Sequence, residues 1–286
     1  LYLMAVSIIV IALIHAYIFA FLFFKKQKLS STFLGLYMVN FFLKGSLYVN
    51  FFYFEISSFY ILFYIYIGST LILDFPLIYM YVKKMVERDY KKSFKHLLHF
   101  LPAFIVFIAQ SIAIFTLPLE HRNLLMVSKE EILLEEEFSV LAMINFISLL
   151  IMFVQMVCYS SLMIYKLIKH KKDIEHHYSY KEQISLNWLL GFVVFYLLYY
   201  LIEVLMYSFD SIKVSEVAYF SIVSLHIFFV GILGLRQRDI YIHDEYVIPE
   251  IEITKEISKD TEIDIPIKIK KEEEDIKTST RKKVLL

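Results

Sequence analysis

The sequence predicts an all-α membrane protein: a bundle of seven transmembrane helices followed by a cytoplasmic, mostly extended or disordered tail. Three observations predict this class. Hydrophobic residues make up 59% of the 286 residues, well above the roughly 45–50% of a soluble domain. Apolar stretches long enough to cross a bilayer recur seven times, and the loops between them alternate in charge. A water-soluble core is excluded, because too little polar surface remains to cover it.

The predicted spans follow from their length. A bilayer core about 30 Å thick needs about 20 apolar residues in a helix. The first stretch is too long for the apolar part of a signal peptide, and no small-residue cleavage site follows it, so we interpret it as a true span. The seven spans are Leu1–Phe24, Thr32–Phe54, Phe59–Val82, Leu97–Pro118, Phe138–Tyr165, Trp188–Tyr207 and Val217–Leu235.

The loop charges predict the orientation of the bundle. The first, third and fifth loops together carry 14 Lys and Arg residues, whereas the other loops carry three. The fourth loop is rich in glutamate. Positively charged loops stay on the cytoplasmic side. We therefore expect a multi-pass protein of a bacterial cytoplasmic (inner) membrane, with its N-terminus outside and its C-terminal segment in the cytoplasm.

The composition changes after the last span. This change divides the chain into a transmembrane sensor domain, residues 1–238, and a charged cytoplasmic linker, residues 239–286. The linker holds 13 acidic and nine basic side chains. Its alternating isoleucines resemble a strand, but Pro266 favours an extended segment instead. Because the chain begins with Leu1 rather than Met, we expect it to be a piece of a longer protein, with an output domain beyond the linker.

Polar residues within the spans are the candidate site. Ionisable side chains are costly in a bilayer, so each is a functional hypothesis. Counting from the cytoplasmic helix ends places most of them at a similar depth in the inner half of the bundle, and Lys44 and Asp74 on neighbouring spans favour an ion pair. The layer is either a ligand-binding or proton-sensitive pocket, or a set of inter-helix hydrogen bonds that fix packing. The candidates are His15, Asn40, Lys44, Asp74, Glu203 and His226.

No catalytic motif stands out in the sequence. It contains no G-x-S-x-G, H-E-x-x-H, P-loop or dinucleotide-binding glycine pattern. His96 and His99 lie on one face of a predicted helix start, but no third ligand is near them, so we expect an interfacial pair. We interpret the single cysteine, Cys158, as a small buried hydrophobic residue. We expect neither an enzyme nor a resident cofactor or metal ion.

Four short strings, in order along the chain, carry a resemblance to a known family. The strings are FPLIYMYVK (Phe75–Lys83), HLLHFLP (His96–Pro102), SLNWL (Ser185–Leu189) and GLRQRDIY (Gly234–Tyr241). Together they resemble the membrane-embedded N-terminal region of AraC-type transcriptional regulators from Bacteroidetes-like bacteria. The resemblance covers about residues 1–241 and touches the tail at Lys277–Thr280.

This resemblance implies a sensory input domain that relays a signal through the linker to a C-terminal pair of helix-turn-helix motifs. That DNA-binding domain is missing from this chain, so DNA is an expected partner only through it. The other expected partners are the lipid bilayer, an unknown small-molecule or envelope signal, and a second copy in a homodimer. Since the ligands of the family are mostly unknown, the resemblance assigns no binding residue.

Three alternatives stay open: a kinase input domain, a transporter, and an intramembrane enzyme, for which the spans offer only His15, Asp74 and His226. The same domain could feed a sensor histidine kinase, although the charged linker lacks the heptad pattern of a dimerisation coiled coil. The chain could also be a free-standing seven-span transporter. Transporters often show repeated halves with broken helices at matching positions, whereas here Pro76 and Pro102 flank a single loop and no repeat is visible.

Overall fold

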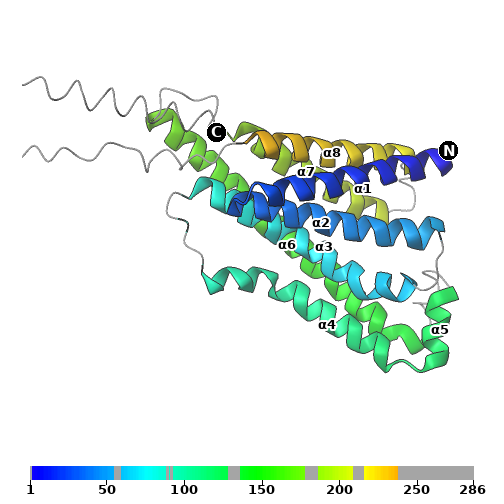
Figure 1. The fold of residues 1–286 in the computed structure, drawn as a ribbon. Helices are drawn as coiled ribbons and strands as arrows, with labels where there is room; N and C mark the ends of the chain where they lie inside the picture. Colours follow the sequence, from blue (N-terminus) through cyan, green and yellow to red (C-terminus); the bar gives the residue numbers. More distant parts are fainter. Residues whose placement is uncertain are drawn as a thin grey trace, which may run out of the picture. The chain divides into compact units, whose positions relative to one another are not determined.

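The computed structural model is helical throughout the residues that it describes (Figure 1). No strand occurs in these ranges, so the all-α class predicted from the sequence is confirmed for them. The linker predicted at residues 239–286 lies outside the described residues. The described residues are 2–54, 59–87, 90, 93–127, 136–177, 186–208 and 216–237.

The helices follow one another with short connections. Three shorter segments flank the α-helices: the π-helical turn η1 (Asn50–Phe54) extends the second α-helix, and the 3-10 helices η3 (Phe94–Phe100) and η5 (Glu136–Phe138) precede the fourth and sixth. The α-helices are α1 (Tyr2–Lys25), α2 (Leu29–Val49), α3 (Tyr60–Val86), α4 (Leu101–Thr116), α5 (Leu119–Val127), α6 (Ser139–His177), α7 (Asn187–Ser208) and α8 (Glu216–Arg236).

Local sequence signals explain several helix ends. Gln27, in the turn between α1 and α2, has a φ of 53°, a left-handed conformation that reverses the chain sharply. Ser93 begins η3 by accepting a hydrogen bond from the backbone N–H of Lys95 at 3.3 Å. Pro102 lies in the first turn of α4, where its missing N–H leaves no helical bond unmade.

Six helical segments among the described residues are long and apolar enough to cross a membrane. They are α1, α2 with η1, α3, η3 with α4, α6, and α8. The remaining predicted span, Trp188–Tyr207, falls on α7, of which Asn187–Leu198 is a shorter apolar stretch within the described residues. The structure therefore shows several long apolar helices, which is compatible with a membrane protein.

Two features differ from the sequence expectation. The acidic fourth loop contains a short helix, α5, whose first turn carries Glu120 and benefits from the positive end of the helix dipole. Helix α6 continues to His177, twelve residues beyond the predicted end of the span at Tyr165. Residues 166–177 contain no Gly or Pro to stop it, so the helix continues past the apolar stretch into a basic one.

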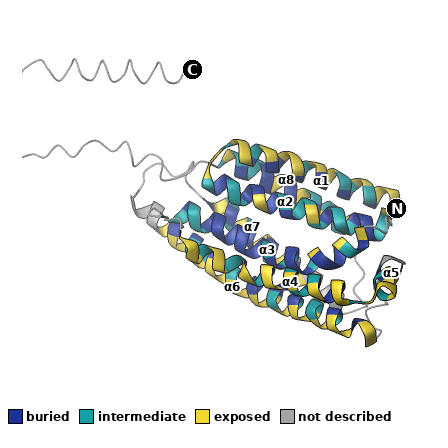
Figure 2. Cartoon of the chain, turned by 60° about the horizontal axis from the view of Figure 1, so that its bottom comes forward, coloured by how far each residue is buried: buried dark blue, intermediate teal, exposed yellow. Residues whose placement is uncertain are grey.

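Helix α3 is the central element of the bundle (Figure 2). In its most apolar window 67% of the residues are buried, against 28% in α4 and in α6. It contacts α2, α4 and α6, while α1 packs against α2 and α8, and α6 packs against α7. The continuous apolar run of α3, from Phe75 to Val82, suits a helix that is buried on all sides.

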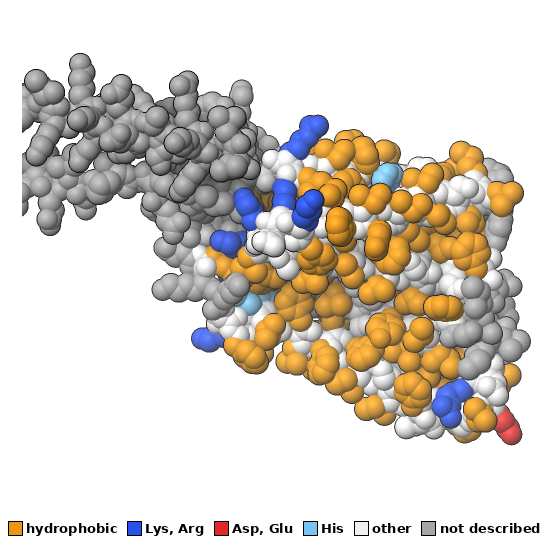
Figure 3. Space-filling model, viewed as in Figure 1, with side chains coloured by type: hydrophobic (Ala, Val, Ile, Leu, Met, Phe, Trp, Pro, Cys, Tyr) orange, Lys and Arg blue, Asp and Glu red, His pale blue; other side chains and the backbone are white. Residues whose placement is uncertain are grey.

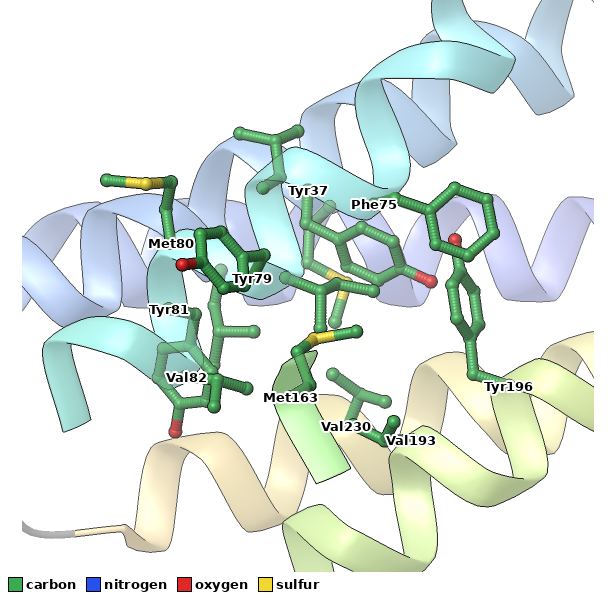
Figure 4. Packing of buried hydrophobic residues seen from close by; sticks show 14 of the residues in the cluster. Tyr37, Phe75, Tyr79, Met80, Tyr81, Val82, Met163, Val193, Tyr196 and Val230 are labelled. Atoms are coloured by element: carbon green, nitrogen blue, oxygen red, sulfur yellow. The ribbon is translucent and has the colours of Figure 1, made fainter. Parts of the chain in front are cut away.

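The main core is built around this helix (Figure 4). Tyr79, Met80 and Val82 of α3 lie among side chains from other helices, including Tyr37 of α2 and Tyr196 of α7. Phe75 of α3 packs against Tyr196, with ring centroids 5.3 Å apart. Tyrosine is well suited to this core, because its ring fills space while its hydroxyl finds a polar partner.

Apolar side chains cover the outer surface of the helices (Figure 3). On α4, Phe104 and Phe115 are 59% and 61% exposed, and on α6 Phe146 is 61% exposed. A continuous apolar surface of this extent is unfavourable in water and favourable against lipid. The expectation that Cys158 is buried is wrong: this residue of α6 is exposed. Its apolar neighbours in sequence did not reveal which face of the helix it occupies.

Candidate functional site

A cavity of about 250 Å³ lies between α1, α2, α3, α7 and α8. One end is polar and is formed by Lys44, Asp74, Tyr200 and His226. The remaining wall is aromatic and aliphatic, and it includes Phe41, Phe52, Phe63, Leu71, Phe220 and Val223. A largely apolar cavity with a few convergent polar groups is the usual form of a small-molecule site.

Asp74 is the centre of the polar end. Its carboxylate is 2% exposed, and its Oδ2 atom lies 2.5 Å from the Lys44 ammonium, in an ion pair. The Tyr200 hydroxyl donates a second hydrogen bond to Oδ2, at 2.8 Å. Asn40 Nδ2 donates to Oδ1 at 2.7 Å. We call Asn40, Lys44, Asp74 and Tyr200 the cavity cluster; its hydrogen bonds satisfy both oxygens of a carboxylate that could not otherwise be buried.

Helical spacing brings these groups together. Asn40 and Lys44 are four residues apart, so both lie on the face of α2 that meets α3. Asn40 also donates to the backbone carbonyl of Thr70, one turn before Asp74, at 2.8 Å. This second bond holds the Asn40 amide in place and joins α2 to α3. Tyr200 reaches the carboxylate from α7, so three helices meet at one buried charge.

His226 forms the second polar feature of the cavity. Its Nε2 atom lies 3.0 Å from the Tyr37 hydroxyl, a hydrogen bond that links α8 to α2. The imidazole stacks on Phe195 and on Tyr196 of α7, with both centroid distances at 5.6 Å. These contacts fix the ring position of His226. Movement of α8 relative to α2 or α7 therefore changes the cavity directly.

The π-helical turn η1 shapes the apolar end. A π turn inserts one extra residue into a helical ladder, and such turns are common at functional sites. It leaves Phe51 stacked on Phe63 at 4.2 Å and Phe52 edge-on to Phe63 at 6.3 Å. Phe52 and Phe63 then face the cavity while Phe51 is fully buried behind them. Aromatic contacts thus hold this wall in position.

The cluster lies close to the middle of the central helix. Asp74 lies 14 residues after Tyr60 and 12 residues before Val86, slightly nearer the Val86 end of α3. The helix continues four residues beyond Val82, the predicted end of the span, and this shifts its midpoint. The apolar wall extends from Asp74 toward the first turns of α3 and α8.

The structure brings four of the six sequence candidates to this cavity. Lys44, Asp74 and His226 line it, and Asn40 donates a hydrogen bond to Asp74. His15 does not lie there. Its ring packs 5.6 Å from Phe228, on the α1–α8 contact. Glu203 lies on α7, but its side chain is outside the described part of the molecule. Which of these residues has a functional role stays a prediction.

Sequence reasoning missed the five tyrosines that line the cavity: Tyr37, Tyr48, Tyr196, Tyr200 and Tyr219. The chain has 22 tyrosines, and their abundance conceals the few that matter. One signal was available, because Tyr196 and Tyr200 are four residues apart and so share a helical face. Their hydroxyls lie 3.3 Å apart.

Two other polar groupings occur in the described chain. His96 lies 3.1 Å from the Lys83 ammonium, and His99 Nδ1 lies 2.8 Å from the Tyr159 hydroxyl, so both histidines join η3 to other helices. No three His, Cys, Asp or Glu side chains among the described residues come together in a way that could hold a metal ion. The histidine pair therefore has the geometry of an interfacial contact.

The second grouping lies between α3, α4 and α6. Gln110 is fully buried and its Nε2 atom donates to Asn145 Oδ1 at 2.8 Å. Gln110 lies beside Gly68 of α3, where an added Cβ would lie 2.7 Å from Gln110 Nε2 and 3.0 Å from Ser148 Oγ. We call Gly68, Gln110, Asn145 and Ser148 the packing cluster. A small residue lets the helices approach closely here.

Comparison with protein-family models, with curated proteins and with solved structures finds no match to this chain. The geometry of the cavity and the sequence patterns are therefore the basis for a function.

Proposed function

We propose that residues 1–238 form a membrane-embedded sensory domain that binds a small molecule in the cavity. The observation that carries the proposal is the cavity itself, with a buried ion pair at one end and an aromatic wall at the other. Within the spans a charged pair beside open space is the usual sign of a functional site. The output in this proposal is the DNA-binding domain of an AraC-type regulator, as the sequence resemblance implies.

The proposed topology has seven spans, with α7 as the sixth and the N-terminus outside. The loop charges support it, because 14 of the loop Lys and Arg residues belong to one side and three to the other. On the face seen in Figure 3, Lys and Arg side chains gather mainly at one end of the helices, beyond the apolar band. In this orientation α8 leads the chain into the cytoplasm.

Helix α8 is the proposed relay. It contributes Val223 and His226 to the cavity. Two contacts hold its other end: Lys26 donates to the carbonyl of Leu235, and Trp188 Nε1 donates to Gln237 Oε1 at 2.7 Å. A ligand that favours one position of α8 over another would change how often these two contacts form. The change would then be passed to the residues that follow α8.

A transporter is the second candidate, and one observation favours it. Pro76 lies inside α3, two residues after Asp74, where it removes a helical hydrogen bond in the middle of the central helix. Transporters bind their substrates near the membrane midplane, beside interrupted helices. The described helices carry this single internal proline, without the matching second break of an inverted repeat.

The test uses the full-length gene in its native host. We expect deletion to change the transcription of a small set of genes, and cross-linking to recover the tagged full-length protein on their promoters. Leu71→Phe, which fills the cavity, should alter the same genes, whereas Leu225→Phe on the exposed face of α8 should not.

The alternatives give different results. Changed transcripts without cross-linked DNA would indicate a sensor histidine kinase instead. Unchanged transcripts together with lost uptake of a solute would indicate a transporter. Either result would overturn the proposed output.

A further inference from the structure

We infer that the cavity takes a small, uncharged molecule with an aromatic or alkyl body and one oxygen acceptor, a hydroxyl or a carbonyl, at one end. The oxygen lies at Lys44, and the body lies among the aromatic side chains at the other end. This inference rests on the proposed sensory function and names its ligand class. It follows from the charge balance, the free donor and the size of the cavity.

The charge balance excludes ionic ligands. Lys44 and Asp74 are the only Lys, Arg, Asp or Glu residues among the described residues that line the cavity, and their charges cancel. Asp74 already accepts from three donors on two helices, Asn40, Lys44 and Tyr200. A carboxylate or an ammonium group on the ligand would bring an uncompensated charge into a site of low dielectric, which is strongly unfavourable.

The remaining N–H donor of Lys44 indicates that the ligand carries an oxygen acceptor. A lysine ammonium carries three N–H donors. The Lys44 ammonium directs two toward Asp74 Oδ2 and the Tyr200 hydroxyl, at 2.5 and 3.4 Å. Among the described residues nothing accepts the third, and 18% of the side chain is exposed where Lys44 lines the cavity. A neutral oxygen on the ligand accepts this proton without disturbing the ion pair.

The walls and the volume define the rest of the molecule. Phe41, Phe52, Phe63 and Phe220 line the apolar part, so the ligand presents a ring or chain to aromatic faces and edges. At about 250 Å³ the cavity is smaller than the roughly 300–1,000 Å³ of drug-sized sites. One aromatic ring with a short alkyl chain fits this space.

Four probes that share one body separate the possibilities: para-hexylphenol, hexylbenzene, para-hexylbenzoate and para-hexylbenzylammonium. The full chain in lipid nanodiscs is heated with each probe, and the rise in unfolding temperature reports binding. We expect para-hexylphenol to raise it most, with an affinity about fivefold above that of hexylbenzene, as one added hydrogen bond implies. The two ionic probes should raise it least.

Filled-cavity variants separate binding from partition into lipid. Leu71→Phe and, independently, Ile67→Phe should abolish the effect of para-hexylphenol, because both residues line the cavity. Leu225→Phe, the same change on an exposed face, should preserve it. Equal shifts in all three variants would show that the probe acts through the bilayer and would overturn the site.

Other results overturn the ligand class alone. Tightest binding by para-hexylbenzoate or by the ammonium probe would show that the site takes an ion. Equal binding of hexylbenzene and para-hexylphenol would remove the role of Lys44 as donor. The transcript experiment uses no added compound, so a sensory role that survives there while every probe fails here would isolate the error in the ligand class.

Discussion

The cavity cluster and the packing cluster are both polar groups inside apolar helices, yet they differ in two physical respects. The cavity cluster contains opposite charges and lies beside open space. The packing cluster is uncharged, and its space is filled so closely that one added methyl group at Gly68 would touch Gln110. Side-chain hydrogen bonds join three helices in the cavity cluster and two helices, α4 and α6, in the packing cluster.

The difference shows how a polar residue in a long apolar helix can be assigned a role. Inter-helix hydrogen bonds between neutral amides stabilise packing at modest cost. A charged pair is costly to bury and is weak evidence for stability, so its presence needs another reason. Adjacent empty volume supplies that reason for Asp74, whereas Gln110 lies against Gly68, where an added Cβ would lie 2.7 Å from its Nε2 atom.

Breaking the ion pair gives the largest expected effect. Asp74→Ala leaves the Lys44 ammonium without its carboxylate, and we expect a loss of about 3 kcal/mol in the free energy of unfolding. Replacing both residues, as Lys44→Met with Asp74→Leu, should recover most of this loss, because no lone charge remains. Unfolding in detergent micelles measures both. Equal losses in the single and the double variant would show that the pair does not act as a pair.

Crowding the packing cluster comes next. Gly68→Ala places a methyl group against Gln110 Nε2, and we expect a loss of about 1.5 kcal/mol, typical of overpacking. Gly191→Ala on α7 is the matched control, since a Cβ there meets no atom within 4 Å. The control should be neutral or slightly stabilising, because alanine favours helix. A neutral Gly68→Ala would mean that the packing cluster tolerates rearrangement and is no tighter than the cavity.

Removing one donor from the cavity cluster gives a smaller loss. Tyr200→Phe deletes the hydroxyl that donates to Asp74 but keeps Lys44 in place, and we expect a loss of about 1 kcal/mol. Tyr165→Phe, on the exposed face of α6, should change the unfolding free energy by less than the measurement error. A loss as large as that of Asp74→Ala would show that the hydroxyl, rather than the ammonium, balances the carboxylate.

Much of the fold was predictable, because long apolar stretches separated by charged loops indicate long helices. Each predicted span coincides with a helical segment of the structure, and helical spacing correctly placed Lys44 beside Asp74. Helix α5 and the extension of α6 were missed, since both are amphipathic or polar and hydropathy does not detect them.

The site was less predictable than the fold. One sequence does not reveal which face of an apolar helix is buried, so Cys158 was placed inside although it lies outside. The same limit conceals Tyr37 and Tyr200, since tyrosine is equally suited to a core, a cavity or a membrane interface. Charges avoid this ambiguity, because lipid exposure is too costly for them, and Lys44 and Asp74 were therefore identifiable.

The smallest expected effect tests whether the packing cluster is held by its hydrogen bond or by its shape. In a double-mutant cycle of Gln110→Ala and Asn145→Ala, we expect a coupling energy of about 0.6 kcal/mol, the usual size for a hydrogen bond between membrane helices. The two single losses should be larger than this, because each change also leaves a void between α3, α4 and α6. None of these variants should alter the response to the cavity probes, since neither residue lines the cavity. A coupling energy above that of Lys44 with Asp74 would reverse the comparison and place the stronger polar contact in the closely packed cluster.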